Sequence, residues 1–178
     1  MQDKIGWIGL GSMGNRMAKN LAKNGYQMLV ADKMDTSAAP QSAHVATTNS
    51  EVISEANILI LSIPAGPDTL EITQEILNSP SSSVEIVIDT STIGIPDAKQ
   101  AAELLSKKGI EYVDAPVSGG IAGAESATLA VMVGCKENIF EKVQPILKCI
   151  GANIFHVGPN PGQGQTVKLL NNFLSATA

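Results

Sequence analysis

The stretch that decides the fold is Ile5-Gly6-Trp7-Ile8-Gly9-Leu10-Gly11-Ser12-Met13-Gly14. Its apolar beginning, residues 5–9, predicts a buried strand. Residues 12–24 predict a helix, because apolar side chains recur on one face and Gly25 follows where a C-cap glycine belongs. The glycines at the junction have the spacing G-x-G-x-x-G, which carries meaning when it follows a strand and opens a helix.

Each glycine of this turn has a physical role in dinucleotide binding. Gly9 permits a tight turn, Gly11 leaves the backbone bare for a pyrophosphate, and Gly14 lets the helix pack close to the strand. The helix N-terminus offers free N–H groups and the positive end of a dipole to the phosphates. The candidate cofactor contacts are therefore Gly9, Leu10, Gly11, Ser12, Met13 and Gly14. The alternative is a tight strand-to-helix turn that binds nothing.

Asp32 ends a second predicted strand, residues 27–32, at about the spacing expected for an acid that binds the adenosine ribose. Its carboxylate would accept hydrogen bonds from the ribose hydroxyls and repel a 2′-phosphate. NAD is therefore favoured over NADP, although Lys33 follows immediately and weakens that preference. The alternative is an ordinary strand-end aspartate that caps a turn.

Apolar runs continue to alternate with helical patterns along the chain. Strands are expected at residues 44–46, 57–63, 84–89 and 111–114, and helices at residues 67–77 and 95–107. Continuous apolar strands indicate a sheet that is covered by helices on both faces. The expected fold is α/β, with a doubly wound, Rossmann-type, mostly parallel sheet. Beyond Pro116, residues 129–133, 136–150 and 153–157 predict a strand, a helix and a strand.

The last segment, residues 167–178, follows a Gly/Pro-rich hinge at residues 158–164. It is apolar on most sides, yet Lys168, Asn171, Asn172 and Ser175 form one polar stripe at helical spacing. Such a helix is expected to be buried on several faces. Because no cap follows it, we expect the helix to continue and the chain to be the N-terminal part of a longer protein. The expected domains are an NAD-binding unit at 1–161 and the beginning of an interdomain helix at 162–178.

Composition excludes several classes of function. The net charge is −5 and no Lys/Arg cluster is present, so nothing supports nucleic-acid binding. The sequence contains no apolar run long enough to span a bilayer. Cys135 and Cys149 suit no metal motif and are expected to be reduced, packed thiols. A strand pattern begins almost at Met1, where a signal peptide would lie, so a cytoplasmic protein is expected.

Three blocks of sequence together resemble the β-hydroxyacid dehydrogenase family, which includes the 3-hydroxyisobutyrate dehydrogenases. The first is the glycine-rich turn with Met17-Ala18 and Asn20-Leu21. The second is Asp114-Ala115-Pro116-Val117-Ser118-Gly119-Gly120, followed by Gly123-Ala124 and Thr128-Leu129. The third is Gly162-Gln163-Gly164-Gln165, which leads to Lys168 and Asn171-Asn172. Their order and spacing match over essentially the whole chain.

The resemblance implies a role for each matching residue. Lys168 would be the general acid/base, and Asn172 would orient the substrate. The substrate carboxylate would bind to Ser118, Gly119 and Gly120, and further cofactor contacts would come from Ile63, Pro64, Asp68 and Thr92. The family also implies an all-helical second domain and a homo-oligomer. Ala127 and Cys135 depart from the family's pattern, because they replace glycines that are common in these blocks.

General acid/base catalysis by Lys168 is also chemically reasonable without the resemblance, because a lysine can transfer protons when burial lowers its pKa. The leading hypothesis is an NAD-dependent dehydrogenase of a small 3-hydroxy acid, whose partner is a carboxylate substrate. One alternative is a dinucleotide-binding domain without turnover. Another is an imine reductase, which resembles the same family but typically lacks the lysine found here at position 168. If these residues have no functional role, Lys168 is merely solvated and Ser118–Gly120 is a loop without a ligand.

Overall fold

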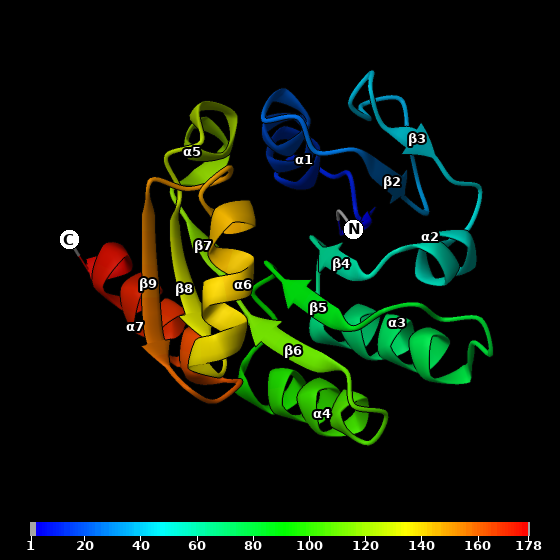
Figure 1. The fold of residues 1–178 in the computed structure, drawn as a ribbon. Helices are drawn as coiled ribbons and strands as arrows, with labels where there is room; N and C mark the ends of the chain where they lie inside the picture. Colours follow the sequence, from blue (N-terminus) through cyan, green and yellow to red (C-terminus); the bar gives the residue numbers. More distant parts are fainter. Residues whose placement is uncertain (1–2, 178) are drawn as a thin grey trace.

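The computed structural model describes residues 3–177 and shows one α/β domain built around a single sheet (Figure 1). The strands are β1 (Ile5–Ile8), β2 (Met28–Ala31), β3 (His44–Val45), β4 (Ile58–Leu61), β5 (Ile86–Asp89), β6 (Glu111–Asp114), β7 (Val117–Ser118), β8 (Ala130–Gly134) and β9 (Asn153–Gly158). The helices are α1 (Gly14–Lys23), α2 (Asn49–Glu55), α3 (Gly66–Asn78), α4 (Ile95–Ser106), α5 (Gly120–Ser126), α6 (Glu137–Leu147) and α7 (Gln163–Thr177).

The sheet is mostly parallel, as the sequence predicts. Its strand order is β3-β2-β1-β4-β5-β6-β8-β7, and β9 pairs with β8. All neighbours from β3 to β6 are parallel, and β8 runs antiparallel to β6 and β7. The first six strands therefore have the order of a Rossmann fold, in which ligands bind beyond the carboxyl ends of the strands.

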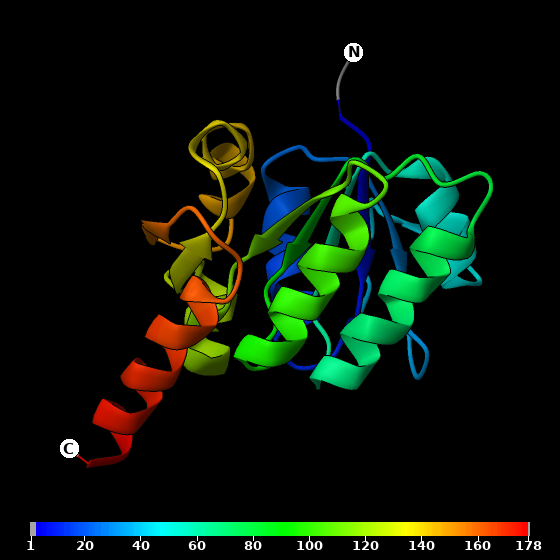
Figure 2. The same ribbon diagram turned by 90° about the horizontal axis from the view of Figure 1, so that it is seen from below.

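Alternating side chains of the strands build two separate cores. In β4, Ile58 and Ile60 belong to one cluster, whereas Leu59 and Leu61 belong to the other. The first cluster includes residues of α1, α5 and α6, and the second includes residues of α2, α3 and α4. Figure 2 shows α3 and α4 side by side along one side of the sheet. Burial on both faces explains why the sequences of these strands are continuous apolar runs.

Three short elements, α2, α5 and β7, are absent from the sequence prediction. A helix of seven residues that buries only Val52 and Ile53, like α2, leaves little apolar periodicity to detect. One signal was nevertheless available: Thr48 caps the helix by accepting the N–H of Glu51, and the Glu51 carboxylate accepts the N–H of Thr47. This Thr-x-x-Glu pattern is close to a capping box.

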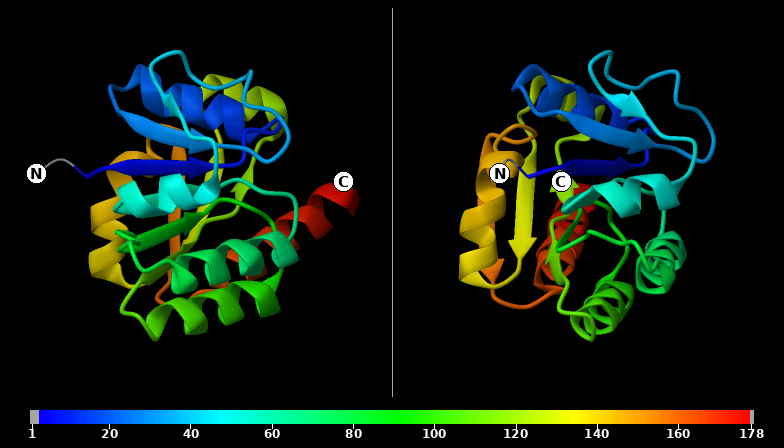
Figure 3. Two further views of the ribbon diagram at one scale, coloured as in Figure 1. Left: turned by 90° about the vertical axis from the view of Figure 1, so that its right-hand side faces the viewer. Right: turned by 45° about the vertical axis from the view of Figure 1, so that its right-hand side comes forward.

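The C-terminal helix α7 differs from its prediction in two ways. It begins at Gln163, within the expected hinge at residues 158–164, and Gly158 belongs to β9. The helix is also not buried on several faces: its polar side, with Gln165 and Lys168, packs on the domain, whereas its apolar side is exposed. The exposed side chains are Leu169, Leu170, Phe173 and Leu174. Figures 2 and 3 show α7 (red) projecting beyond the rest of the domain.

Met1, the first residue of the expected unit at 1–161, and Ala178, the last residue of the expected helix at 162–178, lie outside the described residues. Within residues 3–177, no helix has both the length and the hydropathy needed to cross a membrane. Cys135 and Cys149 are both free and buried, as expected for packed thiols. Burial raises the pKa of Cys135 to about 12, so its thiol is unreactive at neutral pH.

Candidate functional site

A cleft of about 770 Å³ lies beyond the carboxyl ends of the central strands. Its walls come from the glycine-rich turn, the end of β2, the loops after β4 and β5, the first half of α3, the loop at β7 and the first half of α7. The cleft gathers every candidate site residue of the sequence except Leu10. Leu10 has a buried side chain and contributes its backbone N–H to the site instead.

The glycine-rich turn has the backbone that the sequence predicts. Gly9 has φ of 101°, and a Cβ there would lie 2.1 Å from the carbonyl oxygen of Ser62. A Cβ at Gly14 would lie 2.1 Å from the carbonyl oxygen of Gly9. A Cβ at Gly11 would meet nothing within 4 Å. The protein itself therefore requires Gly9 and Gly14, whereas Gly11 leaves open space on the cleft side.

Buried side chains hold this turn in place. The indole N–H of Trp7 donates to the carbonyl oxygen of Gly9 at 2.8 Å, and the side-chain amide of Asn15 donates to the carbonyl oxygen of Gly11 at 2.6 Å. Within residues 3–177, the backbone N–H groups of Gly11, Ser12 and Met13 have no hydrogen-bond partner. The turn therefore presents free donors at the start of α1, which suits an anion.

Asp32 follows β2 and is fixed by backbone donors. Its carboxylate accepts hydrogen bonds from the N–H groups of Leu10 at 2.6 Å, Met34 at 2.7 Å and Asp35 at 3.1 Å. Burial acts to raise the pKa of Asp32, but these hydrogen bonds outweigh it and lower the pKa below its ordinary value. Asp32 is therefore a negative charge at neutral pH, held at one end of the cleft.

The floor of the cleft is organised by the buried carboxylate of Asp89. It accepts hydrogen bonds from Thr69 at 2.8 Å, from Tyr112 at 3.0 Å and from the N–H of Ser91 at 2.9 Å. Burial raises its pKa despite these hydrogen bonds. The hydroxyl of Ser91 in turn accepts the N–H of Ile63 at 3.0 Å. The loops after β4 and β5, which carry the cleft-lining residues 63, 64 and 92, are therefore tied together.

At the other end of the cleft, Lys168 lies on α7 and is only 9% exposed. Burial lowers the pKa of Lys168. Within the described part of the chain it forms no ion pair and no hydrogen bond. Asn172, one turn later, lines the same cleft, and so do Ser118, Gly119 and Gly120. Asn171 joins the two segments, because its side-chain amide donates to the hydroxyl of Ser118 at 3.0 Å.

The beginning of α7 is anchored by two buried residues to which sequence reasoning assigned no role. The side-chain amide of Gln165 donates to Asp114 at 2.7 Å and to the carbonyl oxygen of Ser91 at 3.1 Å. Its oxygen accepts the N–H groups of Ile93 and Gly94. Asp114 also accepts the N–H groups of Gly162 and Gln165. A charged residue at the end of an apolar strand was the available signal for Asp114.

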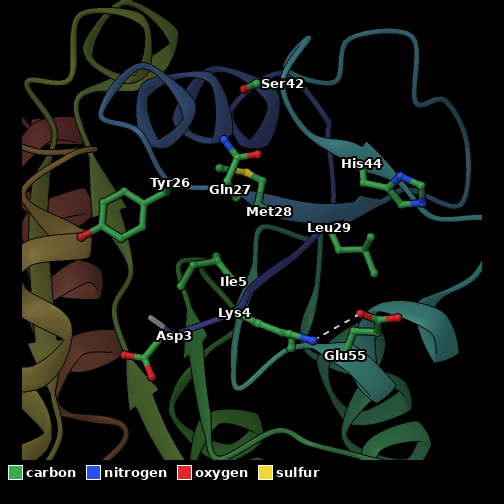
Figure 4. Close-up of a pocket in the computed structure, with 11 residues that line it drawn as sticks. Asp3, Lys4, Ile5, Tyr26, Gln27, Met28, Leu29, Ser42, His44 and Glu55 are labelled. Carbon is green, nitrogen blue, oxygen red and sulfur yellow. Dashed lines mark ion pairs between the residues drawn. The ribbon is translucent and has the colours of Figure 1, made fainter. Parts of the chain in front are cut away.

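A second depression, of about 320 Å³, lies at the amino ends of β1 and β2 (Figure 4). Lys4 and Glu55 form an ion pair of 3.6 Å across it, and both side chains are largely exposed. Ligands of open α/β sheets bind at the carboxyl ends of the strands, so this depression lies at the opposite edge. The cleft beside Lys168 is the candidate site.

The fold, the bare glycine turn and the fixed acid after β2 define a dinucleotide-binding domain of the Rossmann class. Comparison with known families agrees: residues 4–158 match the family described as the NAD binding domain of 6-phosphogluconate dehydrogenase. The chain belongs to this family, and its similarity to hydroxyacid dehydrogenases is that of their N-terminal part.

Individual relatives are hydroxyacid dehydrogenases. The chain is 40% identical to 2-(hydroxymethyl)glutarate dehydrogenase of Eubacterium barkeri, over 96% of this chain and 58% of the relative. It is 38% identical to mitochondrial 3-hydroxyisobutyrate dehydrogenase of Rattus norvegicus, over 97% of this chain and 52% of the relative. The structure of Mycobacterium tuberculosis 3-hydroxyisobutyrate dehydrogenase with L-serine has a TM-score of 0.90 and 34% identity, over 99% of this chain and 61% of that one. The chain thus spans about half to three-fifths of the length of these proteins.

Proposed function

We propose that this domain binds NAD and supplies the proton-transfer residues of a dehydrogenase that converts a small 3-hydroxy acid into its semialdehyde, of the 3-hydroxyisobutyrate type. The proposal depends mainly on the environment of Lys168. A buried lysine without an ion pair in the described structure lines the same cleft as a glycine turn with free N–H groups. Together, a lysine that can transfer a proton and a turn that can bind phosphates suit hydride chemistry on a dinucleotide.

The residues at the first end of the cleft fit a dinucleotide. The free N–H groups of Gly11, Ser12 and Met13 would bind the pyrophosphate, for which the missing side chain at Gly11 leaves room. Asp32 would accept the hydroxyls of the adenosine ribose. The cofactor would also contact Ile63, Pro64, Asp68 and Thr92, which line the same cleft.

The residues at the second end fit proton transfer. When bound, the nicotinamide group supplies the hydride acceptor. Lys168 takes the proton of the substrate hydroxyl in the oxidation and returns it in the reverse direction. Its lowered pKa increases the fraction of neutral amine that can accept this proton. Asn172 donates a hydrogen bond that orients the reacting oxygen.

The loop at residues 118–120 suits the substrate carboxylate. Gly119 and Gly120 have φ of 132° and 64°, which glycine adopts without strain, and a Cβ at Gly120 would meet nothing. Because the hydroxyl of Ser118 accepts a hydrogen bond from Asn171, its own hydrogen is free to donate to a carboxylate. The L-serine that accompanies the Mycobacterium tuberculosis dehydrogenase in its structure is a small 3-hydroxy acid of this kind.

Cofactor binding and turnover test the proposal separately. Trp7 is the single tryptophan and bonds to Gly9, so energy transfer from Trp7 to NADH reports binding. We expect saturation by NADH, followed by NAD reduction with 3-hydroxyisobutyrate, glycerate or serine. An absence of binding at millimolar NADH would contradict the proposal. Binding without turnover of any 3-hydroxy acid would favour the alternative, a dinucleotide-binding domain that performs no catalysis of its own.

A further inference from the structure

An ion pair crosses the rim of the cleft next to Asp32. The ammonium of Lys33 lies 2.7 Å from the carboxylate of Asp68, and both side chains line the cleft. Lys33 follows β2, whereas Asp68 lies in the first turn of α3. The pair therefore connects two walls of the cleft from positions 35 residues apart.

The place of Lys33 gives its charge a consequence for ligand choice. Asp32 favours a ribose with a free 2′-hydroxyl, but a cation beside it attracts a 2′-phosphate. The Lys33 side chain is 68% exposed, and exposed ion pairs contribute little to folding stability. The pair with Asp68 thus matters for where the cation is held rather than for holding the domain together.

The start of the Lys33 side chain is held by its surroundings. Asp32 accepts the N–H groups of Met34 and Asp35, and Asp35 accepts the N–H and the hydroxyl of Ser37. These hydrogen bonds fix the backbone of the turn that follows Lys33, and the partner of its ammonium lies on another element. That partner is Asp68, whose hydrogen bond and charge also raise the pKa of Lys33.

We propose that Asp68 determines cofactor specificity through Lys33: it holds the ammonium toward α3 and neutralises it, so that the cleft offers no free cation to a 2′-phosphate and keeps NAD as its cofactor. This inference rests on the proposed function, because it requires a dinucleotide in the cleft. It gives Asp68 a role that is distinct from touching the cofactor. It also explains how a lysine can follow Asp32 in an NAD site.

The test compares the affinities of NADH and NADPH for the protein and its Asp68→Asn variant, by energy transfer from Trp7. Asparagine is tolerated in the first turn of a helix, so the variant is expected to fold, which its melting temperature checks. Release of Lys33 should raise the affinity for NADPH relative to NADH by about fivefold. The gain should shrink at high salt, because exposed charges are screened.

Glu71→Gln is the matched control. Glu71 lies one turn further along α3 and lines the same cleft, but it forms no hydrogen bond with Lys33 in the described structure. Its replacement by glutamine removes one negative charge, as Asp68→Asn does. We expect the ratio of the two affinities to change less than twofold in this variant. An equal change of this ratio in Glu71→Gln and Asp68→Asn would overturn the proposal, because any nearby negative charge would then have the effect that the proposal assigns to Asp68.

A second pair of variants separates action through Lys33 from direct action. In a Lys33→Met background, Asp68→Asn should leave the NADPH-to-NADH ratio unchanged within about twofold. The same shift with and without Lys33 would show that Asp68 acts by its own charge, which overturns the proposal. A loss of both affinities in Asp68→Asn at constant ratio would show that Asp68 acts only through its own contact with the cofactor and not through Lys33, which also overturns it. Failure of the proposed function is a different result, namely no binding of either cofactor by the unmodified protein.

Discussion

The two ends of the cleft are built by different means. At the glycine end, the ligand-facing groups are backbone N–H groups of one turn, and the fixed acid Asp32 is held by backbone donors. At the lysine end, side chains position the site: the buried Gln165 and Asp114 anchor α7, and the half-buried Asn171 ties it to Ser118. One end is a local structure, and the other is a network of distant side chains.

The difference appears directly in sequence separation. Leu10 and Asp32, which are joined at the glycine end, are 22 residues apart. At the lysine end, Gln165 is 51 residues from Asp114 and 74 from Ser91, to which it bonds. Backbone geometry of the first kind can be inferred from residue types, because glycine and a strand-end acid imply it. Side-chain pairings of the second kind exist only after the sheet has formed.

Replacing Lys168 with alanine tests the lysine end most strongly. Loss of the general acid/base should lower kcat by about a thousandfold in the dehydrogenase that contains this domain. The dissociation constant for NADH should change less than twofold, because the glycine end does not depend on Lys168. Steady-state rates and NADH titration measure the two effects separately.

Lys107→Ala is the control for the loss of one lysine. Lys107 is exposed and pairs with Glu103 on α4, outside the cleft. Its replacement should leave both quantities unchanged. If Lys168→Ala instead weakened NADH binding and left kcat unchanged, the assignment of cofactor binding to the glycine end and of proton transfer to the lysine end would be wrong.

At the glycine end, two neighbouring glycines should fail in opposite ways. Gly11→Val should weaken NADH binding by about a hundredfold while leaving the melting temperature unchanged, because the added side chain enters the space left for the ligand. Gly14→Ala should lower the stability by about 2 kcal/mol, because its Cβ would lie 2.1 Å from the Gly9 carbonyl oxygen. NADH titration and thermal melting distinguish the two outcomes, and a destabilised Gly11→Val with normal affinity would refute the assignment.

Much of the fold and most of the cleft-lining residues could be predicted because their signals are local. The apolar strands, the glycine spacing and the polar stripe on residues 167–178 are each visible within a short segment. The sequence did not predict α2, β7 and α5, because elements of two to seven residues are too short for a periodic pattern. The exposure of Leu169 and Phe173 also escaped, because periodicity indicates which residues share a helix face but not which face packs on the domain.

The lysine end should also respond to pH in a range where the glycine end does not. Burial raises the pKa of Asp114 to about 6 in the folded protein, against about 3.9 in the unfolded chain. Between these values the folded state retains a proton that the unfolded state has lost. The contribution of Asp114 to the free energy of unfolding therefore falls, by about 2 kcal/mol, as the pH rises from about 4 to about 6, and it levels off above this range. Asp32, whose pKa is lowered, stays charged through this range.

Urea unfolding at several pH values checks this prediction. Asp114→Asn should be less stable overall and should show a smaller decline between about pH 4 and 6, because Asp89, whose pKa burial also raises, is still present. Glu141→Gln, which removes an exposed charge from α6, should keep the full decline. If Asp114→Asn shows the same decline as the unmodified protein, Asp114 is not the group that makes the lysine end sensitive to pH.

The smallest effect concerns the backbone at the end of α5, the helix that follows the loop at residues 118–120. Ala127 ends α5 with φ of 58°, and it is the one non-glycine residue with positive φ in the described structure. This left-handed conformation is unfavourable for alanine, so Ala127→Gly should stabilise the protein by about 1 kcal/mol. Ala122→Gly, inside the same helix, should instead destabilise it by about 0.5–1 kcal/mol. At the glycine end, by contrast, the tight positions already hold glycine, so no substitution there offers the same gain. Equal losses of stability in both alanine variants would show that the backbone at Ala127 is unstrained.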